Sequence, residues 1–556
     1  MKKYDFIVIG SGPAGEKAAA QAAYFGKTVA LVEKEPAPGG ACVNTGTIPS
    51  KTLRESAIHL SGLKQRGLYG VNVTVSRDIS VADFMYHERA VVEKAWELID
   101  ENMGRHGVDV YRGTAHFQSP HEIAVDLGSS HIVLNGDYIL IATGSSPNHP
   151  EGIPFDGRAV YDSDSVLNLD RIPKTMAVVG AGVIGCEYAC MFAALGVEVT
   201  LIDGRVELLS HIDQEVSDVL LRQMRNRLKI QMNLGVDVEE VHLNQTLSSE
   251  PSCVHVGLKN GRQLDVEKVL YCAGRQSNTE ALKLETVGVV TGKRGIIEVN
   301  ESYQTNVPHI YAAGDVIGFP ALASTSMEQG RIAATHAFDM ENQTRLASVF
   351  PYCIWTIPEV AVFGSTEEEC LQKGIDYEVG RAYYRNNSRG QIVGDTGGLL
   401  KIIFAPDTRQ ILGVHIVGES AAELVHVGLM VMQLGGSIDQ FIDTVFNYPT
   451  LGEMYKYAAY DGLGRLGRRA QCEINGKPMP DAKTETGVAV NVATGSDKAN
   501  SGETVNPAIA AGSEGHSGQT PNGSKPDAPI ATASATQETP RQRPALAPRN
   551  LPNLPI

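Results

Sequence analysis

Two glycine-rich segments have the residue types and the spacing that bind the pyrophosphate of a dinucleotide. Residues 10–15 read GSGPAG and residues 180–185 read GAGVIG, and each segment follows a short apolar run and precedes a helix-like stretch. Glycine permits the tight turn and lets backbone N–H groups approach phosphates at the N-terminus of the helix. The sequence therefore predicts two dinucleotide sites, built on Gly10, Gly12, Gly15, Gly180, Gly182 and Gly185.

An acidic residue closes the next apolar run after each glycine segment. Glu33 and Asp203 stand where a carboxylate accepts hydrogen bonds from a ribose, and Asp203 favours the free 2′-hydroxyl of NAD. Arg205 could instead meet the 2′-phosphate of NADP, or could be an ordinary solvated charge. We therefore expect the second site to accept both NAD and NADP, with the preference between them left open.

A stretch between the two glycine segments contains a cysteine, a threonine and a lysine close together in the sequence. Cys42 is followed five positions later by Thr47, and Lys51 comes next. Two cysteines at such positions could cycle through a disulfide, but a threonine hydroxyl cannot. In the C-terminal segment 446–453, Tyr448 precedes a proline, and a phenol with an ordinary pKa near 10 is a poor proton shuttle at neutral pH. Cys42 and Thr47 therefore cannot form a disulfide with each other.

Parallel strands and helices are needed to hold these motifs. Apolar runs alternate with helix-like stretches through the body of the chain, which is typical of parallel α/β units. From about 347 to 470 the pattern changes: strand-like segments at 399–404 and 411–417, joined by a turn at 406–408, precede a helical stretch at 421–434. This region is predicted to be an α+β module.

Residues 471–556 contain no aromatic residue and are rich in Pro, Ala, Thr, Gly, Ser and Asn. A segment of this composition cannot bury enough apolar surface to offset the entropy of ordering. We predict a disordered tail, and the alternative is a proline-rich ligand for an adaptor protein around residues 540–552.

Composition narrows the class of protein. The chain has 556 residues and a formal net charge of −16, which argues against a nucleic-acid partner. Its apolar runs are too short for a signal peptide or a membrane span. Eight cysteines without a CxxC motif favour the reducing cytoplasm. Cys186 and Cys190 are read as buried small residues, because no second ligand pair accompanies them, so we predict no metal.

The segment 39–51, together with residues 141–144, 272–275 and 311–315, resembles the flavin disulfide reductases such as lipoamide dehydrogenase and glutathione reductase. The resemblance covers about residues 4–465. It implies an FAD-binding domain at 1–150, an NAD(P)-binding domain at 151–275, a return to the FAD domain at 276–346 and a dimerisation domain at 347–470, before the tail at 471–556. The fold class is then α/β, with two Rossmann-like domains and a C-terminal α+β domain.

The same resemblance assigns site residues. Lys51 and Glu187 match positions that form an ion pair beside flavin N5, and Thr47 would contact the ring. Asp315 would hydrogen-bond the ribityl chain of FAD, and residues 325–328 read as a capping box that opens a helix toward the flavin. The cofactor-binding residues carried over are Gly10, Gly12, Gly15, Glu33, Gly40, Cys42, Gly46, Lys51, Thr143, Gly144, Gly180, Gly182, Gly185, Asp203, Arg205, Gly274, Arg275, Gly314 and Asp315.

The resemblance implies a second cysteine at position 47 and a histidine at position 448, but this chain has Thr47 and Tyr448, so disulfide chemistry lacks two of its parts. This double departure resembles the soluble FAD-dependent pyridine nucleotide transhydrogenases. This resemblance implies reversible hydride transfer between NADPH and NAD⁺ through non-covalent FAD, by a ping-pong mechanism without a redox disulfide, in a homodimer or higher homo-oligomer. The alternatives are a lipoamide dehydrogenase-like reductase that uses another cysteine, an NAD(P)H:quinone reductase, and an interaction scaffold that depends on its tail. The physiological direction of transfer stays open.

Overall fold

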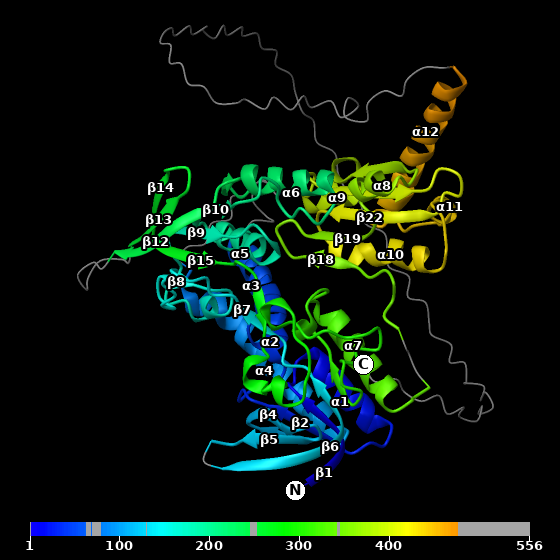
Figure 1. The fold of residues 1–556 in the computed structure, drawn as a ribbon. Coiled ribbons are helices and arrows are strands. Elements are labelled where there is room, and N and C mark those ends of the chain that lie inside the picture. Colours follow the sequence, from blue (N-terminus) through cyan, green and yellow to red (C-terminus); the bar gives the residue numbers. More distant parts are fainter. Residues whose placement is uncertain are drawn as a thin grey trace, which may run out of the picture. The chain divides into compact units, whose positions relative to one another are not determined.

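The computed structural model describes residues 2–62, 68, 79–128, 130–244, 253–341 and 345–475 (Figure 1). The last helix, α12 (Met454–Ile474), crosses residue 470, where the sequence placed the end of the folded part. The rest of the predicted tail, from residue 476 onward, lies outside the described residues. Within the described ranges, no helix is both long enough and apolar enough to span a membrane.

The first glycine segment leaves the central strand of a mainly parallel sheet. Val8 and Phe6 on β1 are fully buried, so this strand forms part of the core. The order is β3-β2-β1-β6-β5-β4, and β17 returns from far along the chain to pair with β6. The strands are β1 (Lys2–Ile9), β2 (Val29–Glu33), β3 (Asp109–Arg112), β4 (Thr114–Ser119), β5 (Glu122–Asp126), β6 (His131–Ile141) and β17 (Ile310–Ala312).

The second glycine segment leaves the central strand of another sheet, whose five strands are all parallel in the order β11-β10-β9-β15-β8. The strands are β8 (Val160–Tyr161), β9 (Thr175–Val179), β10 (Glu198–Asp203), β11 (Gln231–Leu234) and β15 (Lys268–Tyr271). A three-stranded antiparallel sheet follows β11 along the chain, made of β12 (Val238–Asn244), β13 (Cys253–Leu258) and β14 (Gln263–Val266). A two-stranded ribbon pairs β7 (Ser145–Pro147) with β16 (Arg275–Ser277).

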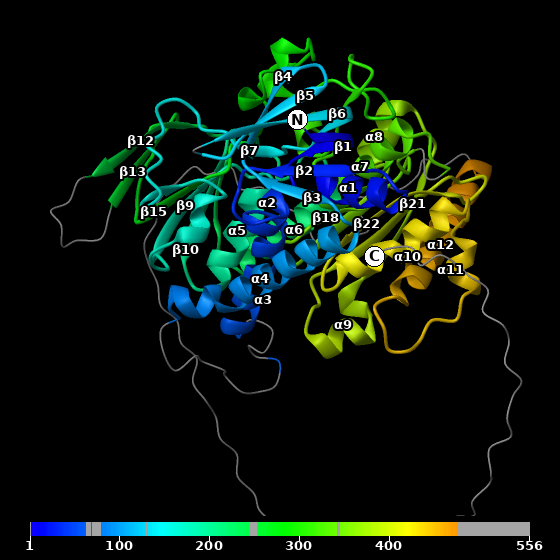
Figure 2. The same cartoon turned by 90° about the horizontal axis from the view of Figure 1, so that it is seen from below.

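Helices cover these sheets and bring distant segments together. Figures 1 and 2 both draw α1 and α7 side by side, and Gln21 of α1 donates a 2.7 Å hydrogen bond to the Thr335 hydroxyl of α7. The helices of this part are α1 (Pro13–Tyr24), α2 (Gly40–Asn44), α3 (Thr47–Leu60), α4 (Val81–Arg105), α5 (Val183–Ala194), α6 (Gln214–Asn226) and α7 (Ala323–Ala337). Short 3-10 helices lie at Ser165–Asn168, Glu280–Leu282, Leu284–Thr286, Lys293–Gly295, Asp315–Ile317 and Tyr384–Asn386.

The predicted capping box at residues 325–328 is wrong. Helix α7 begins at Ala323, its N-cap is Leu322, and no side chain caps it. The Thr325 hydroxyl donates backward to the carbonyls of Pro320 and Leu322, each at 3.0 Å, so it does not accept from the N–H groups of the first turn. These N–H groups therefore have no side-chain cap.

The C-terminal module is an antiparallel sheet in the order β18-β19-β22-β21-β20, covered by helices. The predicted strands at 399–404 and 411–417 are confirmed as β21 (Leu399–Phe404) and β22 (Ile411–Val417), and the predicted helix is α10 (Ala421–Gln433). The remaining elements are β18 (Tyr352–Ile354), β19 (Val360–Gly364), β20 (Glu378–Tyr383), α8 (Glu367–Lys373), α9 (Ser388–Val393) and α11 (Asp439–Asp443).

A buried cluster of charges connects this module to α6. The Lys401 ammonium on β21 lies 2.8 Å from both Asp213 carboxylate oxygens, and neither side chain is more than 1% exposed. Lys401 also pairs with Glu215 and Glu367, and both of these glutamates pair with Arg381. Since Asp213 caps α6 through the N–H of Val216, the cluster fixes the start of that helix against the C-terminal sheet.

Candidate active site and nucleotide pocket

The first glycine turn has no room for side chains where the chain folds back on itself. Gly10 has φ +103°, and a Cβ on it would lie 2.4 Å from the Ala142 carbonyl oxygen. A Cβ on Gly15 would lie 1.9 Å from the Gly10 oxygen. Helix α1 then begins at Pro13 without a side-chain cap, so its first N–H groups are available to an anionic ligand.

Glu33 lies at this turn as expected, but its carboxylate already has protein partners. One oxygen accepts the Ser11 hydroxyl at 2.6 Å and the Ser11 N–H at 2.9 Å, and the other accepts the Glu35 N–H at 2.9 Å. These bonds fix the carboxylate at the end of β2. A ribose hydroxyl would bind to the remaining lone pairs.

Several predicted FAD residues meet around the same turn. A Cβ on Gly40 would lie 2.9 Å from the Gly12 Cα, so the segment of Cys42 and Lys51 closely approaches the glycine turn. Asp315 accepts a 3.0 Å hydrogen bond from Ser145, and Gly314 donates its N–H to Gln329. A Cβ on Gly144 would meet nothing within 4 Å, so the backbone has an open side there. A glycine-lined cradle with uncapped helix N-termini fits the pyrophosphate and ribityl chain of FAD.

The other carried-over residues of this region have structural partners. The Thr143 hydroxyl donates 2.7 Å to the carbonyl of Asn278, and a Cβ on Gly46 would lie 3.0 Å from the Ala41 oxygen. A Cβ on Gly274, which has φ +93°, would lie 3.2 Å from Arg294. Their contacts with a cofactor stay predictions.

Lys51 and Glu187 form the ion pair that the resemblance implies. The Lys51 ammonium on α3 lies 2.8 Å from one carboxylate oxygen of Glu187 on α5, whose side chain is 5% exposed. The other Glu187 oxygen accepts the backbone N–H of Trp355 at 2.8 Å. The sequence missed this last bond, because a backbone donor has no residue signature.

The Cys42 side chain contacts Thr47, and its thiol has a raised pKa. Burial raises the pKa of the Cys42 thiol above its ordinary value, although the contact with the Thr47 hydroxyl and the charge of Lys51 act in the opposite direction. The protonated thiol is a weak nucleophile. The structure thus brings the two predicted residues together without giving the thiol the environment of a reactive cysteine.

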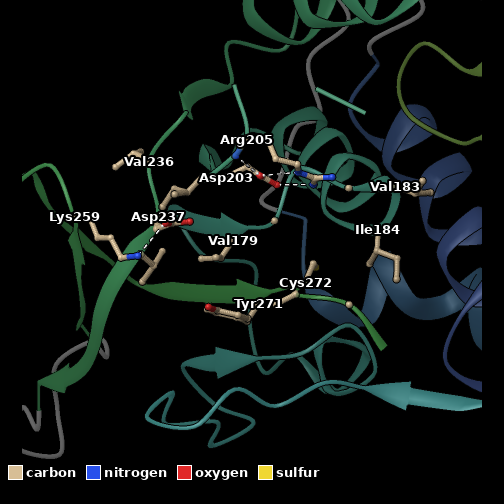
Figure 3. Close-up of a pocket in the computed structure, with 17 residues that line it drawn as sticks. Val179, Val183, Ile184, Asp203, Arg205, Val236, Asp237, Lys259, Tyr271 and Cys272 are labelled. Carbon is tan, nitrogen blue, oxygen red and sulfur yellow. Dashed lines mark hydrogen bonds and ion pairs between the residues drawn. The ribbon is translucent and has the colours of Figure 1, made fainter. Parts of the chain in front are cut away.

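The second glycine turn opens into a cavity of about 640 Å³ (Figure 3). A Cβ on Gly180 would lie 2.5 Å from the Cys272 carbonyl oxygen and a Cβ on Gly185 would lie 1.8 Å from the Gly180 oxygen, whereas a Cβ on Gly182 would meet nothing within 4 Å. The first two glycines therefore build the turn. Gly182, at the N-cap of α5, leaves the backbone open to a ligand.

Asp203 and Arg205 meet at the rim of this cavity as an ion pair. The guanidinium donates to both carboxylate oxygens at 3.0 and 2.8 Å, and Asp203 also accepts the Ala181 N–H at 2.6 Å. Burial opposes the charge of Asp203, but these hydrogen bonds lower the pKa of its carboxyl overall. Arg205 is thus not a free surface charge, and it neutralises the carboxylate that would repel a 2′-phosphate.

A second ion pair at the rim was missed by the sequence analysis. Asp237 and Lys259 lie 3.0 Å apart and line the cavity together with Val236 and Tyr271 (Figure 3). Asp237 and Tyr271 could have been found, because both come at or just after the carboxyl ends of parallel strands, which meet at one sheet edge. Lys259 belongs to the turn of an antiparallel hairpin, and that position gives no such signal.

Arg275 and Tyr448 do not line this cavity, although Gly274, the residue before Arg275, does. Arg275 donates to Ser145 and to Asp164, so its charge is already paired, as are those of Lys51 and Arg205. Tyr448 is 70% exposed, and its hydroxyl lies 2.6 Å from that of Ser388. Among the described residues, no group of three or more His, Cys, Asp and Glu side chains could hold a metal ion.

A mainly parallel sheet and an all-parallel sheet that each lead into a dinucleotide turn, with an ion pair between their helices, define the class of flavin- and pyridine-nucleotide-dependent oxidoreductases. The chain belongs to the pyridine nucleotide-disulphide oxidoreductase family. Residues 4–330 match the sequence model of that family, and residues 350–459 match the model of its dimerisation domain. The protein is therefore an FAD-dependent oxidoreductase with NAD(P) as its nucleotide substrate.

Relatives and solved structures agree with this membership. The chain is 46% identical over 468 residues to a soluble pyridine nucleotide transhydrogenase of Mycobacterium tuberculosis, covering 84% of this chain and 98% of the relative. It is 41% identical to one from Pectobacterium atrosepticum, covering 83% and 98%. Crystallised LpdA from Mycobacterium tuberculosis is similar with a TM-score of 0.75 at 25% identity, covering 83% and 99%. The Cu(II) complex of the flavoprotein disulfide reductase RclA from Escherichia coli has a TM-score of 0.74 at 27% identity, with the same coverage.

Proposed function

We propose that this protein transfers hydride reversibly between NADPH and NAD⁺ through bound FAD, by a ping-pong mechanism that uses no disulfide. The observation that carries the proposal is Thr47 next to a half-buried Cys42, whose thiol pKa is raised, while the Lys51–Glu187 ion pair is intact. The near-complete coverage of relatives named soluble pyridine nucleotide transhydrogenase supports the same activity.

In this proposal, bound FAD supplies a ring that takes hydride from one nicotinamide and gives it to another. The uncapped N-termini of α1 and α5 bind the two pyrophosphates, and Lys51 with Glu187 fixes the charge at the reacting edge. Thr47 contacts the ring without accepting electrons. In this proposal the cavity of about 640 Å³ at the second glycine turn binds one nucleotide at a time, so NADP⁺ leaves before NAD⁺ enters.

Stopped-flow mixing tests the function directly. Mixing the holoenzyme with NADPH should bleach the visible absorbance of FAD, and a second mixing with NAD⁺ should restore it. Failure of NAD⁺ to restore the absorbance would sink the transhydrogenase proposal, and faster restoration by a quinone would favour a quinone reductase. An anaerobic titration counts electrons: FAD alone takes two per subunit, whereas FAD with a redox disulfide takes four.

Replacing Arg205 with glutamine should weaken NADP(H) binding about tenfold to a hundredfold, the range lost with a hydrogen bond to a charged group. The variant also leaves Asp203 unneutralised beside the 2′-phosphate. Binding of NAD(H), which lacks that phosphate, should change less than threefold on the same scale. Equilibrium titration of both nucleotides measures the ratio. A D203N variant is the counterpart and should shift the ratio toward NADP, while an equal loss for both nucleotides in R205Q would contradict the assignment.

The C-terminal module supports a homodimer. Apolar side chains on α10, α12 and the segment between them are solvent-exposed in the single chain, namely Met430, Leu434, Val445, Tyr448, Tyr457 and Tyr460. All of them except Tyr460 belong to the part of the chain that matches the family's dimerisation domain, and Tyr460 directly follows it. The proposal also includes the domain boundaries predicted from the sequence, with the last module extended to the end of α12. It further includes a cytoplasmic location for the protein.

A further inference from the structure

The carboxylate of Glu187 is held by three regions of the chain that are far apart in sequence. Helix α5 carries it, Lys51 of α3 binds one oxygen, and the segment between β18 and β19 binds the other through the Trp355 N–H. With the side chain 5% exposed, water has little access to either oxygen. The orientation of this carboxylate therefore depends on where the backbone of Trp355 lies.

Arg54 fixes that backbone. It lies three residues after Lys51 on α3, its side chain is 4% exposed, and its Nε donates 3.0 Å to the carbonyl oxygen of Thr356, the residue after Trp355. A second guanidinium nitrogen lies 3.3 Å from Glu359, and the guanidinium carbon lies 5.8 Å from the centre of the Trp355 ring.

Further bonds hold the same segment from the C-terminal module. Glu359 accepts the Ala422 N–H of α10 at 3.2 Å with its side chain and the Gly418 N–H at 2.9 Å with its carbonyl. The Thr356 hydroxyl donates 2.6 Å to the carbonyl of Pro358. One buried guanidinium thus links α3 to a rigid segment of the C-terminal module, and that segment provides the second hydrogen bond to Glu187.

We propose that Arg54 is a positioning residue for the Lys51–Glu187 ion pair, acting through the backbone of Thr356 and Trp355. Helix α3 then controls Glu187 twice, directly by Lys51 and indirectly by Arg54. Without Arg54, the Trp355 N–H can move away, and a carboxylate held on one oxygen can rotate about its side-chain bonds. The inference rests on the proposed function only in taking this ion pair as part of the hydride-transfer site.

The test is the limiting rate at which NADPH reduces bound FAD, measured by stopped flow in R54M. We expect a fall of about tenfold to a hundredfold, the cost of small misplacements in an active site, with the NADPH concentration at half-maximal rate changing less than about twofold. R54K, which can still donate to Thr356, should recover most of the rate. Acrylamide quenching of tryptophan emission in the holoenzyme gives a readout independent of activity. In a W96F background, where Trp355 is the remaining tryptophan, quenching should increase in R54M as Trp355 becomes freer.

A double-mutant cycle separates positioning from general loss of structure. In an E187Q background, R54M should lower the limiting rate of FAD reduction by less than about a further twofold, because the carboxylate that Arg54 positions is already absent. E55Q is the matched control, since Glu55 pairs with Arg54 from the exposed side and, among the described residues, forms no hydrogen bond or ion pair with the Trp355 segment. Full-rate reduction in R54M, or an undiminished effect of R54M in the E187Q background, would overturn the inference. Failure of NAD⁺ to reoxidise the wild-type enzyme would instead overturn only the proposed function.

Discussion

Replacing Lys51 with methionine is expected to slow hydride transfer from NADPH to NAD⁺ about a hundredfold to a thousandfold, the usual effect of removing one preorganised electrostatic group. Its ammonium lies 2.8 Å from Glu187, and the side chains are only 26% and 5% exposed, so water screens this charge less than it would at the surface. Methionine preserves the length of the side chain and removes the charge. The Glu187 carboxylate is then left with the Trp355 N–H alone.

Single-turnover measurements of both half-reactions check this expectation, with the FAD content of each preparation determined from its absorbance. K373M is the matched control, because Lys373 forms a 3.0 Å ion pair with Glu369 on the exposed face of α8. Exposed pairs contribute little, and this one is remote from the glycine turns. We expect K373M to transfer hydride at the wild-type rate. Wild-type rates in fully loaded K51M would remove Lys51 from the mechanism.

Local signals were sufficient to predict the two dinucleotide turns and the C-terminal strands. The clash of a Cβ on Gly185 with the Gly180 carbonyl oxygen shows why only glycine serves there, so the motif alone identifies the turn. The parallel sheets were predicted from the alternation of strands and helices. Each of these elements is recognised by the spacing of its apolar residues, which depends only on residues close together in the sequence. The Lys51–Glu187 pair spans 136 positions, and only the family resemblance could connect the two.

The features that the sequence did not reveal depend on tertiary contacts. Asp203 and Arg205 were read as favouring different nucleotides, but folding pairs them, and the carboxylate loses its repulsion toward NADP. The predicted cap of α7 was wrong because the Thr325 hydroxyl donates to carbonyls of the preceding turn. The spacing of residues in the sequence does not determine which of these partners a threonine hydroxyl binds. Arg54 belongs to no motif, since the Thr356 carbonyl and the Glu359 carboxylate that it binds lie about 300 residues away along the chain.

The largest expected effect on stability comes from Lys401. K401M should lower the free energy of unfolding by about 3–5 kcal/mol, because it removes one partner of a buried ion pair and leaves Asp213 uncompensated. The two side chains are 1% and 0% exposed, so water cannot replace the lost ammonium. A K401M/D213N double variant should recover part of the loss, since it no longer buries a bare carboxylate. Urea unfolding of the holoenzymes at neutral pH measures both differences.

The pH dependence of this difference follows from the shifted groups. Burial opposes the charge of both Asp213 and Glu215. Lys401 nevertheless lowers the pKa of the Asp213 carboxyl below its ordinary value, and Arg381 together with Lys401 does the same for Glu215. Groups with a lowered pKa stabilise the fold above the unfolded-state pKa of about 4, and this stabilisation is lost as the pH falls through the lowered value. The carboxylates raise the pKa of Lys401 despite its burial, so its contribution is retained up to the unfolded-state pKa of about 10. Wild type and K401M should therefore differ most between about pH 5 and 9 and converge in acid, whereas a gap that stays constant down to pH 3 would show that the stabilisation is not electrostatic.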